Sequence, residues 1–244
     1  MGRTKITLTL GALTLACAVA GEAMGEEPPW PPPRPAQLAP AAPGGAALQP
    51  APQPTAKGAD SNCLSTLIAS GAFAEAVPAP TPTVEGCEIA APTRLSAVTL
   101  TGGDVVTLPD RPVLGCAFAL VLADYVRLIV APLAESMLHA KVAAIETGPG
   151  YECRTQDRVA GAKISAHAKG LAVDFAAIAL ADKRRVLIER QTGADEESYF
   201  RAVRTAACGW FTTVLGPGAD VFHARNMHLD IERHGSSGSY RICE

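Results

Sequence analysis

The chain has 244 residues, of which 48% are hydrophobic and 18% are charged, and its formal net charge is −3. This length allows one or two domains, and the apolar fraction is sufficient for a sizeable core. The small net charge gives no sign of the basic patch that nucleic-acid binding requires, so no nucleic-acid partner is expected.

The first twenty residues have the pattern of a secretory signal peptide. Arg3 and Lys5 precede an apolar run over residues 6–20, and residues 18–20 (Ala-Val-Ala) form a small-x-small cleavage site. The run is too short for a comfortable membrane span, so no stable span is expected after cleavage. Cys17 raises the alternative of a lipoprotein anchor, but the residues before it match the leucine-led lipobox poorly. We therefore predict a signal peptide over residues 1–20 and a secreted or periplasmic protein.

Residues 21–58 are rich in Pro and Ala and include the run Pro28-Pro-Trp-Pro-Pro-Pro-Arg-Pro35. Such a segment favours an extended polyproline II conformation and cannot form a packed core. We predict a disordered linker over residues 21–58, followed by a single domain over residues 59–244. The simpler interpretation of the linker is a spacer. The alternative is a ligand for a Pro-recognising module, whose identity the sequence does not reveal.

Six cysteines remain in the predicted domain: Cys63, Cys87, Cys116, Cys153, Cys208 and Cys243. An even number of cysteines in an exported chain indicates disulfide bonds, and six cysteines allow fifteen pairings. Spacing alone does not choose among these pairings. A zinc site built from cysteines is the alternative, but the chain has no Cys-x-x-Cys pair, and export makes oxidation the favoured outcome.

The first half of the predicted domain shows three structural patterns. Residues 61–77 predict a short helix that Gly71 can end, and the runs 98–100 and 105–108 predict a hairpin. The longest helical pattern covers residues 116–139. Its charged residues favour a core helix over a membrane helix, and a proline within it is expected to kink the helix or start a second one.

The second half combines strand patterns with a further helix. Residues 141–146, 171–176, 211–215 and 227–231 read as strands, and residues 195–207 form a helix with an apolar stripe. The predicted fold class is α+β, with a small mixed or antiparallel sheet and helices packed on one side.

Two stretches of the chain bring together residues that bind metals. The first is Ser165-Ala-His-Ala-Lys-Gly-Leu-Ala-Val-Asp174, and the second is His223-Ala-Arg-Asn-Met-His-Leu-Asp230. A catalytic zinc takes three protein ligands with N or O donors and leaves one position for water. We predict that His167, Asp174 and His228 form this set.

The local patterns around these residues make the metal site geometrically reasonable. Gly170 permits a turn with positive φ directly after His167. Alternation along the following strand places Asp174 on the face opposite Val173, and His228 lies on a second alternating strand. Two adjacent strands would then present Asp174 and His228 to one ion. The alternative is that His167 caps a turn and Asp174 is a satisfied polar residue.

Several separated motifs resemble one protein family in the right order. They are Tyr151-Glu-Cys-Arg154, Ser165 to Asp174, Val214-Leu-Gly-Pro-Gly218, His223 to Asp230 and Tyr240-Arg-Ile-Cys243. Together they resemble the bacterial extensin-like C-terminal domain family over about residues 60–244. That family in turn is similar to the zinc D,D-peptidases and murein endopeptidases, which share their fold with the hedgehog signalling domain.

This resemblance implies a structure and an activity. It implies a hedgehog-like, disulfide-stabilised fold with the pairs Cys63–Cys87, Cys116–Cys153 and Cys208–Cys243, each worth about 2–4 kcal/mol. It also implies a bound zinc ion (Zn2+) and a peptidase or amidase activity on the peptide stems of peptidoglycan in the cell envelope. By the same resemblance Arg154 stands near the reacting carbonyl or a substrate carboxylate. Ser165 is either a hydroxyl that contacts substrate or the cap of a turn.

The chain departs from the peptidases at the general base. They carry a Glu three residues, or a His two residues, before the last metal ligand, where this chain has Arg225 and Asn226. Neither side chain takes up a proton at neutral pH. His223 is one substitute, and Asp230 is another if it does not instead orient a ligand His.

This departure leaves alternatives to an enzyme. One is a non-catalytic zinc-binding module that recognises cell-wall peptides, and another is a structural wall protein that is stabilised by disulfides and binds no metal.

Overall fold

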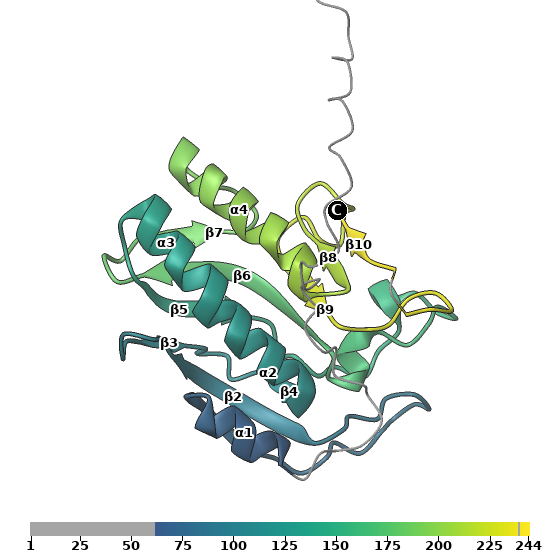
Figure 1. Cartoon of the computed structure of the whole chain (residues 1–244). Helices are drawn as coiled ribbons and strands as arrows, with labels where there is room; N and C mark the ends of the chain where they lie inside the picture. The colour runs from purple at the N-terminus through teal and green to yellow at the C-terminus, as the bar shows by residue number, and fades with distance from the viewer. Residues whose placement is uncertain (1–61, 239) are drawn as a thin grey trace, which may run out of the picture. The chain divides into compact units, whose positions relative to one another are not determined.

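The computed structural model describes residues 62–238 and 240–244, so the predicted signal peptide and linker lie outside the described residues. The described chain combines helices with a mixed sheet (Figure 1). The predicted α+β class is therefore confirmed. The expected likeness to the hedgehog domain stays a prediction.

The sheet has ten strands in the order β1-β2-β3-β5-β6-β9-β8-β10, with β4 paired to β2 and β7 paired to β6. The strands are β1 (Ala72–Ala76), β2 (Pro92–Thr99), β3 (Val105–Thr107), β4 (Val113–Gly115), β5 (Val142–Thr147), β6 (Ala172–Leu180), β7 (Arg185–Leu187), β8 (Thr213–Leu215), β9 (Met227–Asp230) and β10 (Ile242–Cys243). Two pairings are parallel, β3 with β5 and β8 with β10. The sheet has more strands than the small sheet predicted, because strands of two or three residues are too short to show alternation.

The helical elements are α1 (Cys63–Ala69), α2 (Cys116–Tyr125), the π-helical turn η1 (Val126–Val130), α3 (Ala131–Leu138), the 3-10 turns η2 (Gln156–Arg158) and η3 (Ala166–Lys169), and α4 (Ala194–Trp210). Figure 1 shows α2, α3 and α4 in front of the sheet, and α3 packs against α4. This arrangement matches the expected packing of helices on one side of the sheet.

The long helical pattern over residues 116–139 is confirmed, with a change of helix type in its middle. The π-helical turn η1 separates α2 from α3, and Pro132 lies in the first turn of α3. Because the helix continues from η1 into α3, Pro132 cannot donate the usual backbone hydrogen bond one turn back, and the π-helical turn lies just before it. Residues 116–138 are long and apolar enough to cross a membrane, and half of the most apolar window is buried in the domain. This burial is typical of a core helix.

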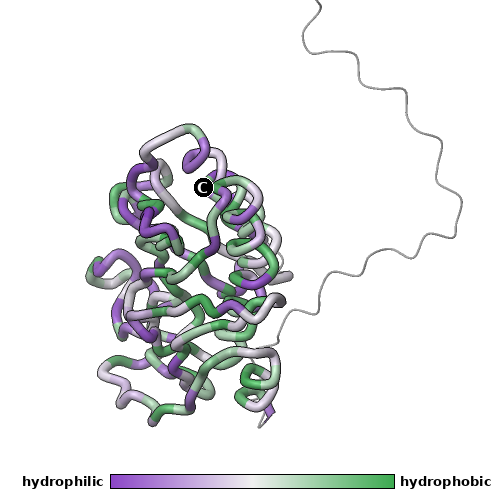
Figure 2. Tube along the Cα trace, turned by 90° about the vertical axis from the view of Figure 1, so that its left-hand side faces the viewer, coloured by the Kyte–Doolittle hydropathy of each residue, from purple (hydrophilic) through white to green (hydrophobic). Residues whose placement is uncertain are grey.

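A shared apolar core joins the helices to the sheet. Phe118, Tyr125 and Phe211 form an aromatic cluster, with the Tyr125 and Phe211 ring centroids 5.0 Å apart. The Tyr125 hydroxyl donates a hydrogen bond to the Val203 carbonyl of α4 at 2.7 Å, which satisfies its polar group inside the core. Figure 2 shows the hydrophobic residues concentrated in the central elements and hydrophilic stretches in the outer loops.

The beginning of the domain differs from its predicted structure. The helix expected over residues 61–77 ends at Ala69, and Gly71 turns the chain with φ +93°. Residues 72–76 then form β1 and pair antiparallel with β2. The apolar residues at helical spacing end before Gly71, which ends the helix as expected, and pairing with β2 decides the structure beyond it. The predicted hairpin is confirmed, with Val98 opposite Val106.

Three disulfides link the domain: Cys63–Cys116, Cys87–Cys153 and Cys208–Cys243. Only the last of the three pairings implied by the family resemblance is therefore correct. Disulfides persist in oxidising compartments, so these bonds are consistent with an extracellular or periplasmic location.

The two corrected pairings follow from contacts between segments that are far apart in the sequence. Cys63 begins α1 and Cys116 begins α2, and the two helices are in contact. Cys87 lies in the loop before β2, where its carbonyl accepts a hydrogen bond from the Tyr151 hydroxyl at 2.8 Å. This contact places Cys87 beside Cys153. The two loops therefore interlock, an arrangement that spacing along the sequence does not reveal.

Candidate metal centre

His167 lies in the 3-10 turn η3, between Ser165 and Gly170. The Ser165 hydroxyl accepts a hydrogen bond from the His167 backbone N–H at 3.3 Å, so this side chain caps the turn. Gly170 ends the turn with φ +66°, and the chain then enters β6. Ser165 and His167 are both buried. The turn holds the imidazole at the N-terminal end of β6.

Gly170 is required for both its conformation and its surroundings. A Cβ atom at this position would lie 2.4 Å from Ile89 Cδ1 and 2.7 Å from the Gly115 backbone nitrogen. The Gly115 N–H donates a hydrogen bond to the Gly170 carbonyl at 2.8 Å. The predicted glycine turn is confirmed, and it also brings two backbones together in a way that no side chain permits.

Asp174 and His228 are directly opposite each other on the paired strands β6 and β9. Their neighbours Val173 and Leu229 are fully buried in the core. Because successive side chains of a strand point to opposite faces, Asp174 and His228 project from the face of the sheet that is turned away from this core.

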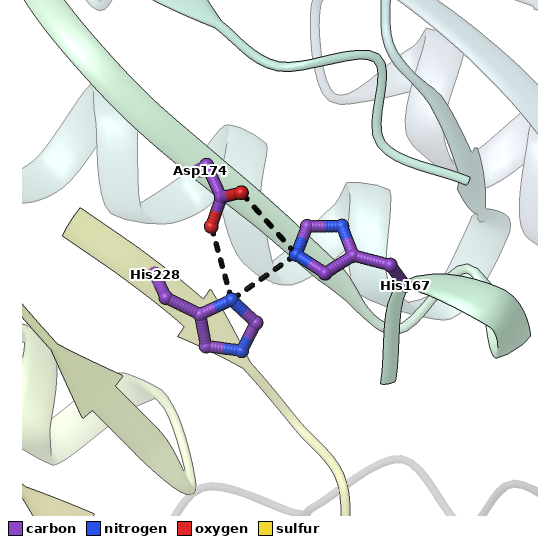
Figure 3. Close-up of side chains that lie close together, drawn as sticks. All are labelled: His167, Asp174 and His228. Atoms are coloured by element: carbon purple, nitrogen blue, oxygen red, sulfur yellow. Dashed lines mark hydrogen bonds and ion pairs between the residues drawn. The ribbon is translucent and has the colours of Figure 1, made fainter. Parts of the chain in front are cut away.

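The three predicted ligands converge on one point (Figure 3). His228 Nδ1 lies 3.0 Å from Asp174 Oδ1 and 3.1 Å from His167 Nε2, and His167 Nε2 lies 3.5 Å from Asp174 Oδ2. Bonds of about 2.0–2.1 Å in tetrahedral geometry separate zinc ligands by about 3.3 Å. The spacing of the donor atoms therefore suits a small tetrahedral metal ion.

The other nitrogen of each imidazole already has a hydrogen-bond partner. His167 Nδ1 lies 2.7 Å from the Gly150 carbonyl oxygen, and His228 Nε2 lies 3.0 Å from Asp230 Oδ2. A carbonyl only accepts hydrogen bonds, so His167 Nδ1 carries a proton, and Nε2 faces the cluster. Asp230 holds His228 Nε2 in the same way. This is the arrangement by which proteins orient histidines that bind metals.

Asp230 lies behind His228 as seen from the three converging donor atoms. Its Oδ1 accepts hydrogen bonds from the Thr212 hydroxyl at 3.1 Å and from the Glu232 N–H at 3.0 Å. Both carboxylate oxygens of this buried side chain are thus satisfied. Of the two roles expected for Asp230, this placement favours the orientation of His228 over that of a general base.

The charges of the cluster reinforce one another. Burial raises the pKa of Asp174, but the hydrogen bonds and charges of His167 and His228 outweigh this effect and hold that pKa well below its ordinary value. Burial lowers the pKa of His228, but the carboxylates of Asp174 and Asp230 raise it to about 9. The metal-free site thus places a cationic ring between two anions.

The family model for the extensin-like protein C-terminus matches residues 61–244. The chain belongs to this family. No curated protein and no solved structure matches the chain. The matched region contains the predicted metal ligands and all the cysteines that form disulfides.

In this extensin-like domain His223 lies beside the cluster and outside the predicted ligand set. Its ring centroid is 5.6 Å from that of His228, and the two rings meet edge to face. His223 Nδ1 lies 2.8 Å from Asp220 Oδ1, and the same oxygen accepts the N–H groups of Phe222 and His223. Asp220 therefore orients the ring and leaves His223 Nε2 as a hydrogen-bond acceptor.

Two other predicted site residues have local partners in the extensin-like domain. The Arg154 side chain lies 2.8 Å from Glu152 Oε2, and Ser165 caps the turn of His167. Glu152 is also bound by Arg158 at 2.7 Å. Burial raises the pKa of Glu152, but its bonds to the two arginines outweigh this effect and lower it. Contact of Arg154 or Ser165 with a substrate stays a prediction.

The sequence analysis missed three residues that shape the site. Asp220 could have been found from its spacing of three residues before His223, which suits an acid that orients a His in a turn. Gly150 and Thr212 act through a backbone carbonyl and a single hydroxyl that reach across the fold. No sequence signal marks such contacts.

Proposed function

We propose that this extensin-like domain is a zinc-dependent peptidase or amidase that acts on peptidoglycan peptides in the cell envelope. The observation that supports this proposal is the orientation of the two imidazoles. Each has one nitrogen bound to an acceptor behind it, and His167 Nε2 and His228 Nδ1 face the Asp174 carboxylate. Two nitrogens and one carboxylate match the ligand set of catalytic zinc sites, which keep a further position for water or substrate.

A zinc ion held by these residues would acidify a bound water and polarise a carbonyl. The chain contributes the orientation and a proton acceptor. Asp230 fixes the tautomer of His228, and Asp220 does the same for His223, so His223 Nε2 is free to take a proton. The edge-to-face contact with His228 keeps this ring beside the cluster. His223 thus substitutes for the base that is missing at Arg225 and Asn226.

The substrate class rests on the resemblance to wall peptidases together with the predicted export. The predicted signal peptide and spacer, together with the disulfides, agree with a protein that works in an oxidising envelope compartment. A peptide stem supplies the amide carbonyl that such a site hydrolyses.

The second candidate is a zinc-binding module that recognises wall peptides without cutting them. The observation that favours it is the exposure of Arg225, whose side chain is 87% exposed and lies 3.7 Å from Glu189. The usual base position therefore contributes no proton acceptor to the site.

The first experiment measures the zinc content of the purified, oxidised protein by elemental mass spectrometry. We expect about one zinc per chain in the wild type and loss of zinc in His167→Ala and His228→Ala. The control is His139→Asn, because His139 is exposed and has the left-handed conformation that Asn tolerates. A folded wild-type protein without zinc, even after zinc is supplied, would remove both candidates.

The second experiment separates the candidates by digestion of muropeptides, with products followed by chromatography. For a hydrolase, His223→Ala keeps its zinc and loses about 10²–10⁴-fold in rate. If the zinc-loaded wild type forms no product at any pH, the domain is a recognition module.

A further inference from the structure

Asn226 lies directly before β9, two residues from His228. Alternation along an extended chain places Asn226, His228 and Asp230 on the same face. This is the face on which Asp174 meets His228. Asn226 is half-buried, whereas His228 and Asp230 are buried, so Asn226 lies nearer to solvent along this row.

The carbonyl oxygen of the Asn226 side chain is unusual in its hydrogen bonding. Among the side-chain N and O atoms of the described residues, Asn226 Oδ1 is the one that is buried without a hydrogen-bond partner. Its neighbours on this face differ, because His228 binds Asp230 and Asp230 in turn binds Thr212 and Glu232. Leaving a buried acceptor unpaired is costly, so such a group in a folded protein calls for a donor that is not part of the chain.

We propose that Asn226 Oδ1 accepts a hydrogen bond from an amide N–H of the ligand bound at the metal centre. This inference rests on the proposed function and deepens it. An amide oxygen accepts hydrogen bonds but takes up no proton, so Asn226 selects a ligand without acting as a base. The substrate class is then a peptide whose amide nitrogen carries hydrogen, and esters or N-alkylated amides are disfavoured.

The strength of the preference for an N–H ligand follows from the burial of the unpaired Asn226 Oδ1. A site built to bind a donor strongly rejects analogues that lack it, because the buried partner is then left unpaired. A ligand with the N–H group satisfies Asn226 Oδ1, whereas an N-methylated ligand leaves it buried without a donor. We therefore expect a preference of about tenfold for the N–H form, which lies within the range that an unpaired buried acceptor costs.

The first test uses stability in the metal-free protein. Asn226→Leu replaces the unpaired amide with an apolar group of similar size, so we expect the thermal unfolding midpoint to rise by about 2–4 °C. The matched control is Asn62→Leu, because Asn62 is exposed and makes no capping hydrogen bond with its side chain. A lower midpoint in Asn226→Leu would overturn the proposal, since it would show that the amide has a stabilising partner within the fold.

The second test uses two small zinc-binding probes, acetohydroxamic acid and N-methylacetohydroxamic acid, titrated calorimetrically into the zinc-loaded protein. We expect the wild type to favour the N–H probe about tenfold more than Asn226→Leu does, at equal zinc content. Asn226→Asp retains an acceptor oxygen and should retain the preference. Equal ratios in the wild type and Asn226→Leu would overturn the proposal. If the wild type binds no zinc, the proposed function fails, and the stability test alone decides the state of Asn226.

Discussion

The two faces of strand β6 have different roles in this domain. On one face Val173 and Phe175 are fully buried and belong to the apolar core. On the other face Asp174 keeps 23% of its side chain exposed and contacts His167 and His228. The side chains of the core face are held by apolar packing and need no hydrogen-bond partners. The site face is held by directional polar contacts, so fold and site occupy one strand but depend on different interactions.

The largest expected effect comes from breaking the core face. Phe175→Ala removes a fully buried ring, and we expect it to lower the free energy of unfolding by about 3–5 kcal/mol. Urea or guanidinium unfolding measures this loss. At denaturant concentrations below the unfolding transition the variant should still bind zinc, because the side chains of Asp174 and His228 project from the other face. Loss of zinc from a folded Phe175→Ala protein would show that the two faces are coupled.

A smaller effect is expected from loosening the site face without removing a ligand. Asp230→Asn weakens the contact that orients His228, so we expect a 10–100-fold loss of zinc affinity with zinc still bound at saturation. Competition with a fluorescent chelator measures this change. Asp182→Asn is the control, because Asp182 is exposed and lies in the turn between β6 and β7. An unchanged affinity in Asp230→Asn would mean that β9 alone positions the imidazole.

An effect of at most the same size is the dependence of zinc binding on pH. The pKa of His228 is raised to about 9 in the metal-free protein, so at neutral pH the ring is protonated and zinc must displace that proton. Zinc affinity should therefore rise with pH from about 7 to 9, by up to about tenfold per pH unit, and then level off. Calorimetry in buffers of different ionisation enthalpy detects the released proton. Binding without proton release would contradict this assignment.

The same raised pKa contributes a pH-dependent part of the stability of the metal-free protein. A pKa higher in the folded than in the unfolded state stabilises the fold fully below the unfolded value of about 6.5. This contribution is lost as pH rises through about 9. The metal-free protein is thus expected to have a lower free energy of unfolding at pH 10 than at pH 7. This difference comes from His228 on the site face and not from the packing of the core face.

The convergence of His167, Asp174 and His228 could be predicted because each residue carried a local signal. Gly170 marked the turn after His167, and alternation placed Asp174 and His228 on adjacent strands. Other features had no local signal. The Ala-rich strand β1 forms only because β2 lies beside it, and the π-helical turn η1 forms within a continuous apolar helix. The orientation of His167 depends on a single carbonyl of Gly150, which any residue type would offer.

The backbone contact between Gly115 and Gly170 links the position of His167 to the disulfides. Gly115 directly precedes Cys116, which is bonded to Cys63, while the Glu152 N–H beside Cys153 donates to the His167 carbonyl. The turn that carries His167 is therefore framed by both interlocked disulfide loops. Reduction of either disulfide is therefore expected to loosen this turn and to displace the His167 side chain from Asp174 and His228.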